Sequence, residues 1–166
     1  MGHIYLIGFM GSGKSTVGAA LARATGYTLF DTDELIVSRD GRTIPDIFSE
    51  SGEPFFRRIE SEVISDIADM TESAVVSCGG GVVLAPTNVL AMKRSGSLIW
   101  LTASSGEILR RVSSDRSRPL LSGKKTIADI EKLMAARHER YEDAADVMVS
   151  TDGRSVDDIV GDILQL

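Results

Sequence analysis

The residues best suited to chemistry lie near the start of the chain, in the stretch GFMGSGKST at positions 8–16. Gly8, Gly13, Lys14 and Ser15 match every fixed position of the pattern G-x-x-x-x-G-K-[ST]. Glycines let successive backbone N–H groups turn inward around an anion, and a helix that begins here adds the positive end of its dipole. We therefore expect a loop that binds the phosphates of a nucleotide through Gly11, Ser12, Gly13, Lys14, Ser15 and Thr16.

Two side chains of this loop have separate predicted tasks. Lys14 is expected to reach the β- and γ-phosphates as a catalytic residue, and the Ser15 hydroxyl is expected to ligate Mg²⁺. Such a loop is shared by GTPases, motor ATPases and kinases, so it predicts phosphate binding but not the reaction. The Asn-Lys-x-Asp motif usual in guanine-specific proteins is absent, because the single asparagine, Asn88, precedes Val89. Adenine is therefore the favoured base.

Five further motifs follow the loop: FDTD at 30–33, GEPFFRRIE at 52–60, CGGG at 78–81, RPLL at 118–121 and RHERY at 137–141. In order and spacing, from the first residues almost to the last, they resemble the shikimate kinase family. The resemblance implies transfer of a phosphoryl group from ATP, with Mg²⁺, to the 3-hydroxyl of shikimate. It also implies a place on the pathway to chorismate and aromatic amino acids, in the cytoplasm of microbes.

The resemblance further implies an acceptor site. Asp33 would bind shikimate, position its hydroxyl and accept its proton as a catalytic residue. Arg57 and Arg137 would hold the substrate carboxylate, since a planar guanidinium binds a carboxylate bidentately. Glu60 lies one helical turn after Arg57 and is expected to orient that guanidinium. The alternative for each arginine is a solvated position on a charged helix.

Backbone and metal contacts complete this expectation. The glycines Gly79, Gly80 and Gly81 follow a strand, where they would bring the backbone close to the substrate or simply form a permissive turn. Asp31 and Asp33 are expected to end a strand and to point to opposite sides of it, which gives them separate tasks. Asp31 would then hold Mg²⁺, in part through water. Either aspartate could instead cap the next helix.

Further arginines are candidates for the ATP side. Arg118 opens RPLL and is expected to act catalytically by neutralising charge on the transferring phosphoryl group, with Arg116 as a competitor for this role. Arg111 and Arg154 match positions at which members of the family hold adenine. Both could equally be solvated arginines.

These groups have to be positioned by secondary structure, and short apolar runs alternate with amphipathic stretches. This alternation predicts a parallel sheet with helices on both faces. Strands are predicted at 3–8, 28–31, 74–78, 97–101 and 146–149, and helices at 14–25, 33–40, 43–50, 54–69, 86–94, 105–113, 126–144 and 155–165. Thr43, Ser104 and Ser155 open three of these helices in capping-box-like sequences.

The resemblance makes the fold more specific. It implies a single-domain α/β P-loop kinase over residues 1–166, with a five-stranded parallel sheet of strand order 2-3-1-4-5 and helices on both faces. The polar, basic stretch 114–125 lacks a hydrophobic period, and we expect it to form most of a mobile lid at about 113–123.

Composition limits the alternatives. The chain has 166 residues, a net charge of −6 and only 5% aromatic residues, which argues against nucleic acid as a partner. One cysteine, Cys78, and two histidines exclude an internal disulfide and the usual zinc sites, and they favour a cytoplasmic protein. The apolar run near the start is too short to cross a membrane.

We expect a monomer whose partners are ATP and shikimate, with no nucleic acid and no membrane. Two rival functions remain open at this point. One is another small-metabolite kinase of the same architecture, acting on gluconate or a nucleoside monophosphate. The other is a nucleotide-binding module without catalysis.

Overall fold

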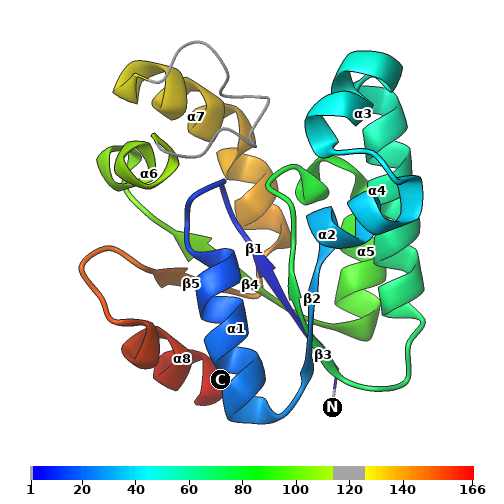
Figure 1. Cartoon of the computed structure of the whole chain (residues 1–166). Helices are drawn as coiled ribbons and strands as arrows, with labels where there is room; N and C mark the ends of the chain where they lie inside the picture. Colours follow the sequence, from blue (N-terminus) through cyan, green and yellow to red (C-terminus); the bar gives the residue numbers. More distant parts are fainter. Residues whose placement is uncertain (1, 114–125) are drawn as a thin grey trace.

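A five-stranded parallel sheet forms the centre of the computed structural model, which describes residues 2–113 and 126–166 (Figure 1). Its strand order is β2-β3-β1-β4-β5, as predicted. The register places Tyr5 opposite Val76 on one side and Leu98 on the other, so β1 is the central strand. The strands are β1 (His3–Ile7), β2 (Thr28–Asp31), β3 (Ala74–Ser77), β4 (Gly96–Thr102) and β5 (Val147–Ser150).

The predicted helices are all present in the described residues, and each bound lies within one residue of its prediction, a difference that is usual at helix ends. A short 3₁₀ helix, η1 (Val82–Leu84), was not predicted. The α-helices are α1 (Lys14–Thr25), α2 (Thr32–Asp40), α3 (Ile44–Ser51), α4 (Glu53–Ala68), α5 (Pro86–Ser95), α6 (Ser105–Val112), α7 (Ile127–Ala144) and α8 (Val156–Leu164).

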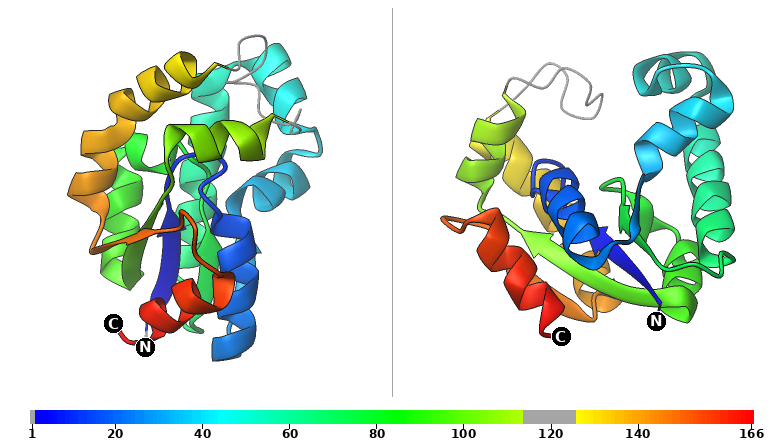
Figure 2. Two further views of the ribbon diagram at one scale, coloured as in Figure 1. Left: turned by 90° about the vertical axis from the view of Figure 1, so that its left-hand side faces the viewer. Right: turned by 60° about the horizontal axis from the view of Figure 1, so that its bottom comes forward.

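Alternate side chains of the strands enter two apolar layers, because successive residues of a strand face opposite sides of the sheet. Leu6, Val75 and Ile99 belong to the layer covered by α1 and α8. Tyr5 and Val76 belong to the opposite layer, which α4, α5 and α7 cover. Figures 1 and 2 show these two groups of helices on the two faces of the sheet. Burial on both faces explains why β1, β3 and β4 are almost continuously apolar in sequence.

The three predicted helix starts are confirmed. The side chains of Thr43, Ser104 and Ser155 each accept a hydrogen bond from the amide three residues later, at 3.3, 3.3 and 3.1 Å. Each bond satisfies one of the amides that a helix leaves without a partner at its N-terminus. Local sequence therefore determines where α3, α6 and α8 begin.

The prediction that both aspartates end the second strand was right for Asp31 and wrong for Asp33. Strand β2 ends at Asp31, whose Oδ1 accepts hydrogen bonds from the amides of Asp33 at 2.9 Å and Glu34 at 3.2 Å. Asp31 is thus the N-cap of α2, and Asp33 lies in the first turn of that helix. Strand alternation does not set the direction of Asp33, since the cap turns the chain into a helix one residue earlier.

The loops at the carboxyl ends of the strands gather at one end of the sheet (Figure 1). Helices α6 and α7 rise on one side of this end, and α2 and α3 on the other, while both chain termini lie at the opposite end of the sheet. Open α/β sheets bind their ligands at the carboxyl ends of the strands. None of the helices within the described residues combines the length and apolarity that a membrane crossing requires.

Candidate active site

The glycine-rich loop connects β1 to α1 and has the geometry of an anion site. Gly8 has a φ of +145° and Gly13 a φ of +102°, conformations that residues with a side chain rarely adopt. Helix α1 begins at once after Gly13, so its free N-terminal amides and its dipole face the loop. The predicted nucleotide-binding residues all lie in this loop and in the first turn of α1: Gly11, Ser12, Gly13, Lys14, Ser15 and Thr16.

Lys14 bends back over the loop that precedes it. Its side chain is buried, and Nζ donates hydrogen bonds to the carbonyl oxygens of Gly8 at 2.7 Å and Phe9 at 2.9 Å. These bonds hold the ammonium group directly beside the anion-binding turn. A cation in this position can move onto a phosphate by exchanging neutral acceptors for charged ones.

The two residues predicted to hold a metal ion are neighbours. Ser15 Oγ lies 3.5 Å from Asp31 Oδ2, while the other carboxylate oxygen of Asp31 caps α2. Asp31 can therefore cap α2 and also ligate a metal ion, because a different carboxylate oxygen serves each role. One hydroxyl and one carboxylate suit Mg²⁺, which keeps several waters and takes further ligands from phosphates.

Two carboxylates face each other across Gly79. A Cβ atom on Gly79 would lie only 3.0 Å from both Asp33 Oδ1 and Glu60 Oε2. The amide of Gly79 donates a 2.9 Å hydrogen bond to Thr32 Oγ1, which ties the turn after β3 to the start of α2. The absence of a side chain at Gly79 is thus what allows Asp33, from one element, to approach Glu60, from another.

Glu60 is an almost completely buried acid, with only 1% of its side chain exposed. Its Oε1 accepts a 2.9 Å hydrogen bond from Arg57 Nη1, whereas Oε2 has no hydrogen-bond partner among the described residues. Burial raises the pKa of Glu60 to about 7, although Arg57 opposes this shift. The bond to Arg57 confirms the prediction that Glu60 orients this guanidinium.

Arg57 is held by two acids on its own helix. Besides Glu60, it contacts Glu53, whose Oε1 accepts hydrogen bonds from Nη2 at 3.1 Å and from Nε at 3.3 Å. Burial acts to lower the pKa of Arg57, but Glu60 and Glu53 raise it on balance, so the group stays charged. The guanidinium lies against Gly81, where it occupies the space that a Cβ atom would need.

Arg137 has a different environment. It is a buried residue of α7, and no ion pair joins it to a carboxylate within residues 2–113 and 126–166. A Cβ atom on Gly80 would lie 3.4 Å from Arg137 Nη1, 3.5 Å from Met10 N and 3.6 Å from Gly8 O. Gly80 is therefore the point where this guanidinium meets the phosphate loop.

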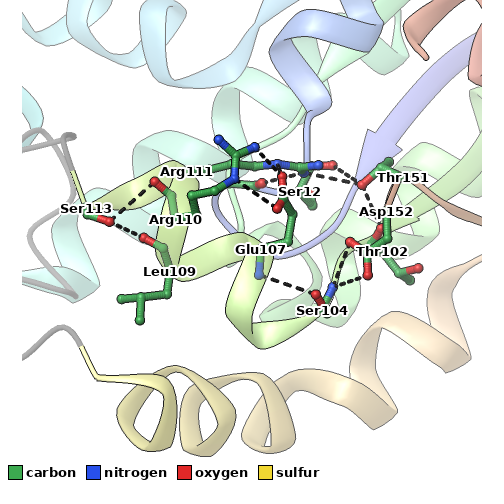
Figure 3. A network of polar contacts seen from close by, with 11 residues as sticks. Ser12, Thr102, Ser104, Glu107, Leu109, Arg110, Arg111, Ser113, Thr151 and Asp152 are labelled. Atoms are coloured by element: carbon green, nitrogen blue, oxygen red, sulfur yellow. Dashed lines mark hydrogen bonds and ion pairs between the residues drawn. The ribbon is translucent and has the colours of Figure 1, made fainter. Parts of the chain in front are cut away.

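Arg111 supports the phosphate loop from outside (Figure 3). Its Nη1 donates hydrogen bonds to Gly11 O at 2.9 Å and to Thr151 Oγ1 at 3.3 Å, while Nε pairs with Glu107 at 2.9 Å. Arg154 instead pairs with Asp162 of α8 at 2.6 Å. Of the two arginines predicted to hold adenine, only Arg111 thus touches the loop.

Arg118, Arg116 and the RPLL motif lie outside the described residues, as does the predicted lid except for Ser113. The predicted acceptor side chains Asp33, Arg57 and Arg137 come from three different helices and meet around the turn after β3, which Gly79, Gly80 and Gly81 form.

Two residues of this region were missed in the sequence. Thr32 stands between two aspartates and binds the amide of Gly79, and Tyr141 donates a hydrogen bond to the carbonyl oxygen of Gly80. A signal existed for Tyr141, because it follows Arg137 by four residues and so shares its face of α7. Which backbone group it meets depends on packing between distant elements.

A parallel sheet of this order, a phosphate loop after its central strand, and two arginines at the glycine turn beside that loop define a kinase of the P-loop class. The shikimate kinase family model matches residues 10–166 of the chain. A shikimate kinase of Geobacter sulfurreducens is 45% identical over 161 residues, which cover 97% of this chain and 88% of that protein. The chain belongs to the shikimate kinase family, whose members are ATP-using phosphotransferases with an alcohol acceptor.

Solved structures agree with this assignment. The shikimate kinase of Acinetobacter baumannii, determined in complex with shikimate, superposes with a TM-score of 0.94 at 32% identity and covers 99% of this chain and 92% of its own. A gluconokinase of Sinorhizobium meliloti superposes with a TM-score of 0.57 at 19% identity, over 99% of this chain and 90% of its own. The second likeness shows the shared fold alone.

Proposed function

We propose that the protein transfers the γ-phosphoryl group of ATP to the 3-hydroxyl of shikimate, which yields shikimate 3-phosphate and ADP. The observation that carries this proposal is the contact at Gly80. There the guanidinium of Arg137 and the backbone of the phosphate loop both approach the position that a Cβ atom on Gly80 would take. A substrate whose carboxylate is bound by Arg137 and Arg57 would have its ring within reach of a phosphate bound to the loop.

The roles of the acceptor residues follow from their charges. Arg57 and Arg137 bind the carboxylate of shikimate, and the backbone of Gly79, Gly80 and Gly81 lies against its ring. Asp33 binds the hydroxyl that is phosphorylated, orients it and accepts its proton. Catalysis by this set is mostly positioning of the two substrates, which phosphoryl transfer requires more than covalent chemistry.

On the donor side, the loop amides and Lys14 bind the β- and γ-phosphates. Lys14 leaves the carbonyl oxygens of Gly8 and Phe9 for the phosphates, where it stabilises the charge of the transferring group. Ser15 and Asp31 would hold Mg²⁺, which would supply positive charge beside the phosphates and so help to neutralise the charge that develops during transfer. Arg118 adds a second cation to the γ-phosphate, and Arg111 and Arg154 flank the adenine.

We further infer a cytoplasmic monomer. Every residue of the proposed site comes from one chain, so the reaction needs no second copy. The single cysteine, Cys78, is buried, and burial raises the pKa of its thiol, in keeping with a small apolar core residue of a protein in a reducing compartment. The place of the reaction is the pathway to chorismate and aromatic amino acids.

The decisive experiment measures ADP release with Mg-ATP against shikimate, quinate, gluconate and AMP. Of the four acceptors, we expect only shikimate to cause ADP release. Asp33→Asn should abolish this ADP release while ATP still binds. Release with gluconate or AMP in place of shikimate would establish the rival kinase. ATP binding without release in the presence of any acceptor would reduce the protein to a nucleotide-binding module.

A further inference from the structure

The turn after β3 consists of three glycines, and its conformation depends on hydrogen bonds because no side chain restricts it. The amide of Gly79 is held by Thr32 Oγ1 at 2.9 Å. The carbonyl oxygens of Gly79 and Gly81 are held by amides of η1 at 3.1 and 3.0 Å. The remaining carbonyl, that of Gly80, accepts a hydrogen bond from a side chain, the hydroxyl of Tyr141.

This one bond determines where an important amide points. A trans peptide is planar, so the carbonyl of Gly80 and the N–H of Gly81 point in opposite directions. Fixing the carbonyl towards α7 therefore aims the Gly81 N–H away from α7. In the described part of the chain, the amides of Gly80 and Gly81 donate to no protein acceptor, which leaves both available to a ligand. The guanidinium of Arg57 lies against the same Gly81.

Tyr141 is itself rigidly placed. It is 2% exposed, and its ring stacks on Trp100 of β4 with a centroid distance of 5.6 Å and an interplanar angle of 26°. Burial raises the pKa of Tyr141 to about 12, so the phenol keeps its proton and remains a donor at neutral pH. Arg137 lies one helical turn earlier and interacts with the same hydroxyl.

We propose that Tyr141 is a positioning residue for the acceptor carboxylate. By binding the carbonyl of Gly80 and contacting Arg137, its hydroxyl holds an amide donor and a guanidinium in one arrangement. Tyr141 acts through these groups and does not touch the substrate. The inference rests on the proposed function, since it assumes that the acceptor is an anion bound at this turn.

The test compares two conservative variants that each lose one buried hydroxyl. Tyr141→Phe keeps the ring stacked on Trp100 but removes the donor to Gly80. Tyr5→Phe is the matched control, because Tyr5, the middle residue of β1, is fully buried and its hydroxyl lies 2.7 Å from Oγ of Ser95, the last residue of α5. A loss of substrate affinity that came only from a weaker fold should appear in both variants alike.

We expect Tyr141→Phe to weaken shikimate binding about 10-fold, since a buried carbonyl loses its donor. Calorimetric Kd and steady-state KM for shikimate should both show this, with the KM for ATP changed less than about 2-fold. Tyr5→Phe should leave both substrates unaffected. In the Arg137→Ala background the loss caused by Tyr141→Phe should shrink, because both residues act on one carboxylate.

Unchanged shikimate affinity in Tyr141→Phe, or an equal loss of ATP and shikimate affinity, would overturn the inference. If this variant fails to unfold cooperatively, Tyr141→Met, which also lacks a donor, takes its place. We expect the same loss of shikimate affinity, and the same two results would overturn the inference. A wild-type protein that neither binds shikimate nor releases ADP with it would instead refute the proposed function itself.

Discussion

The phosphate loop and the proposed acceptor site are built in opposite ways, although they meet at Gly80. The loop is one continuous segment whose backbone amides, helix dipole and Lys14 serve a single anion. The acceptor site joins side chains of α2, α4 and α7 around a turn that has no side chains of its own. A local motif is sufficient for the first, whereas the second exists only if distant elements pack correctly.

Their charges differ as well. Lys14 donates hydrogen bonds to two neutral carbonyl oxygens, whose place a phosphate can take. On the acceptor side, Arg57 is bound by two acids and Arg137 by none in the described residues. The loop is therefore prepared for any nucleotide phosphate. The proposed acceptor site combines a guanidinium that two acids hold with a second that has no acidic partner in the described part of the chain, and we expect this pair to favour a single carboxylate in a defined orientation. Four predictions test this contrast.

The largest effect is expected on the loop. Lys14→Ala should lower kcat about 10³-fold, since the cation that stabilises the transferring group is lost. Shikimate affinity should change little, because the acceptor site does not depend on Lys14. Steady-state kinetics with a calorimetric shikimate titration checks both points, and Lys93→Ala, an α5 lysine paired with Asp146 away from the site, is the control. Near-normal turnover in Lys14→Ala would contradict the loop assignment.

The next effect concerns the buried acid of the acceptor site. The pKa of Glu60 is raised from 4.5 to about 7 in the folded protein, so the folded state binds the proton more tightly than the unfolded one. The stability contributed by Glu60 is therefore present below pH 4.5 and is lost as the pH rises to 7. This loss amounts to roughly 3 kcal/mol.

Glu60→Gln removes this titration. Between pH 4.5 and 7 the free energy of unfolding of the wild type should fall relative to that of the variant, which urea denaturation at several pH values measures. Glu62→Gln is the control, since Glu62 lies half exposed on the same helix. Parallel pH profiles for wild type and Glu60→Gln would show that Glu60 is not the titrating group.

Arg137→Ala should weaken shikimate binding about 30-fold by removing a charge-assisted hydrogen-bonding group. ATP affinity should change by less than about 3-fold, because the loop amides remain in place. Arg140→Ala provides a matched control on the exposed face of the same helix. Equal losses of affinity for both substrates, determined by calorimetry, would argue that Arg137 supports the fold and does not bind the carboxylate.

The smallest effect separates the two tasks of Asp31. Asp31→Asn keeps a good helix cap, so stability should be unchanged, but the Mg²⁺ concentration for half-maximal activity should rise about 10-fold. Asp31→Ala should raise it similarly and also lower the free energy of unfolding by about 1 kcal/mol through the lost cap. Magnesium titrations and urea denaturation distinguish these outcomes. Unchanged magnesium dependence in both variants would leave Asp31 as a cap only.

Much of the fold could be predicted from local sequence. Apolar runs marked the buried strands, and Thr43, Ser104 and Ser155 marked helix starts correctly, because caps act over three residues. The same local logic failed at Asp33. There the cap at Asp31 started a helix, and strand alternation no longer applied. The stack of Tyr141 on Trp100 joins residues 41 positions apart, and no local pattern specifies such a pair.

By itself, the sequence determined the phosphate loop, the alternation of strands and helices and, through the order of its motifs, the family. These depend on residue types at short spacings, where backbone geometry leaves few possibilities. Only the tertiary structure decided that Glu60 is buried between Arg57 and Gly79, that Arg137 is unpaired within the described residues, and that Tyr141 holds Gly80. Burial and pairing are set by which distant surfaces pack together, and this packing determines the charge and direction of each group at the acceptor site.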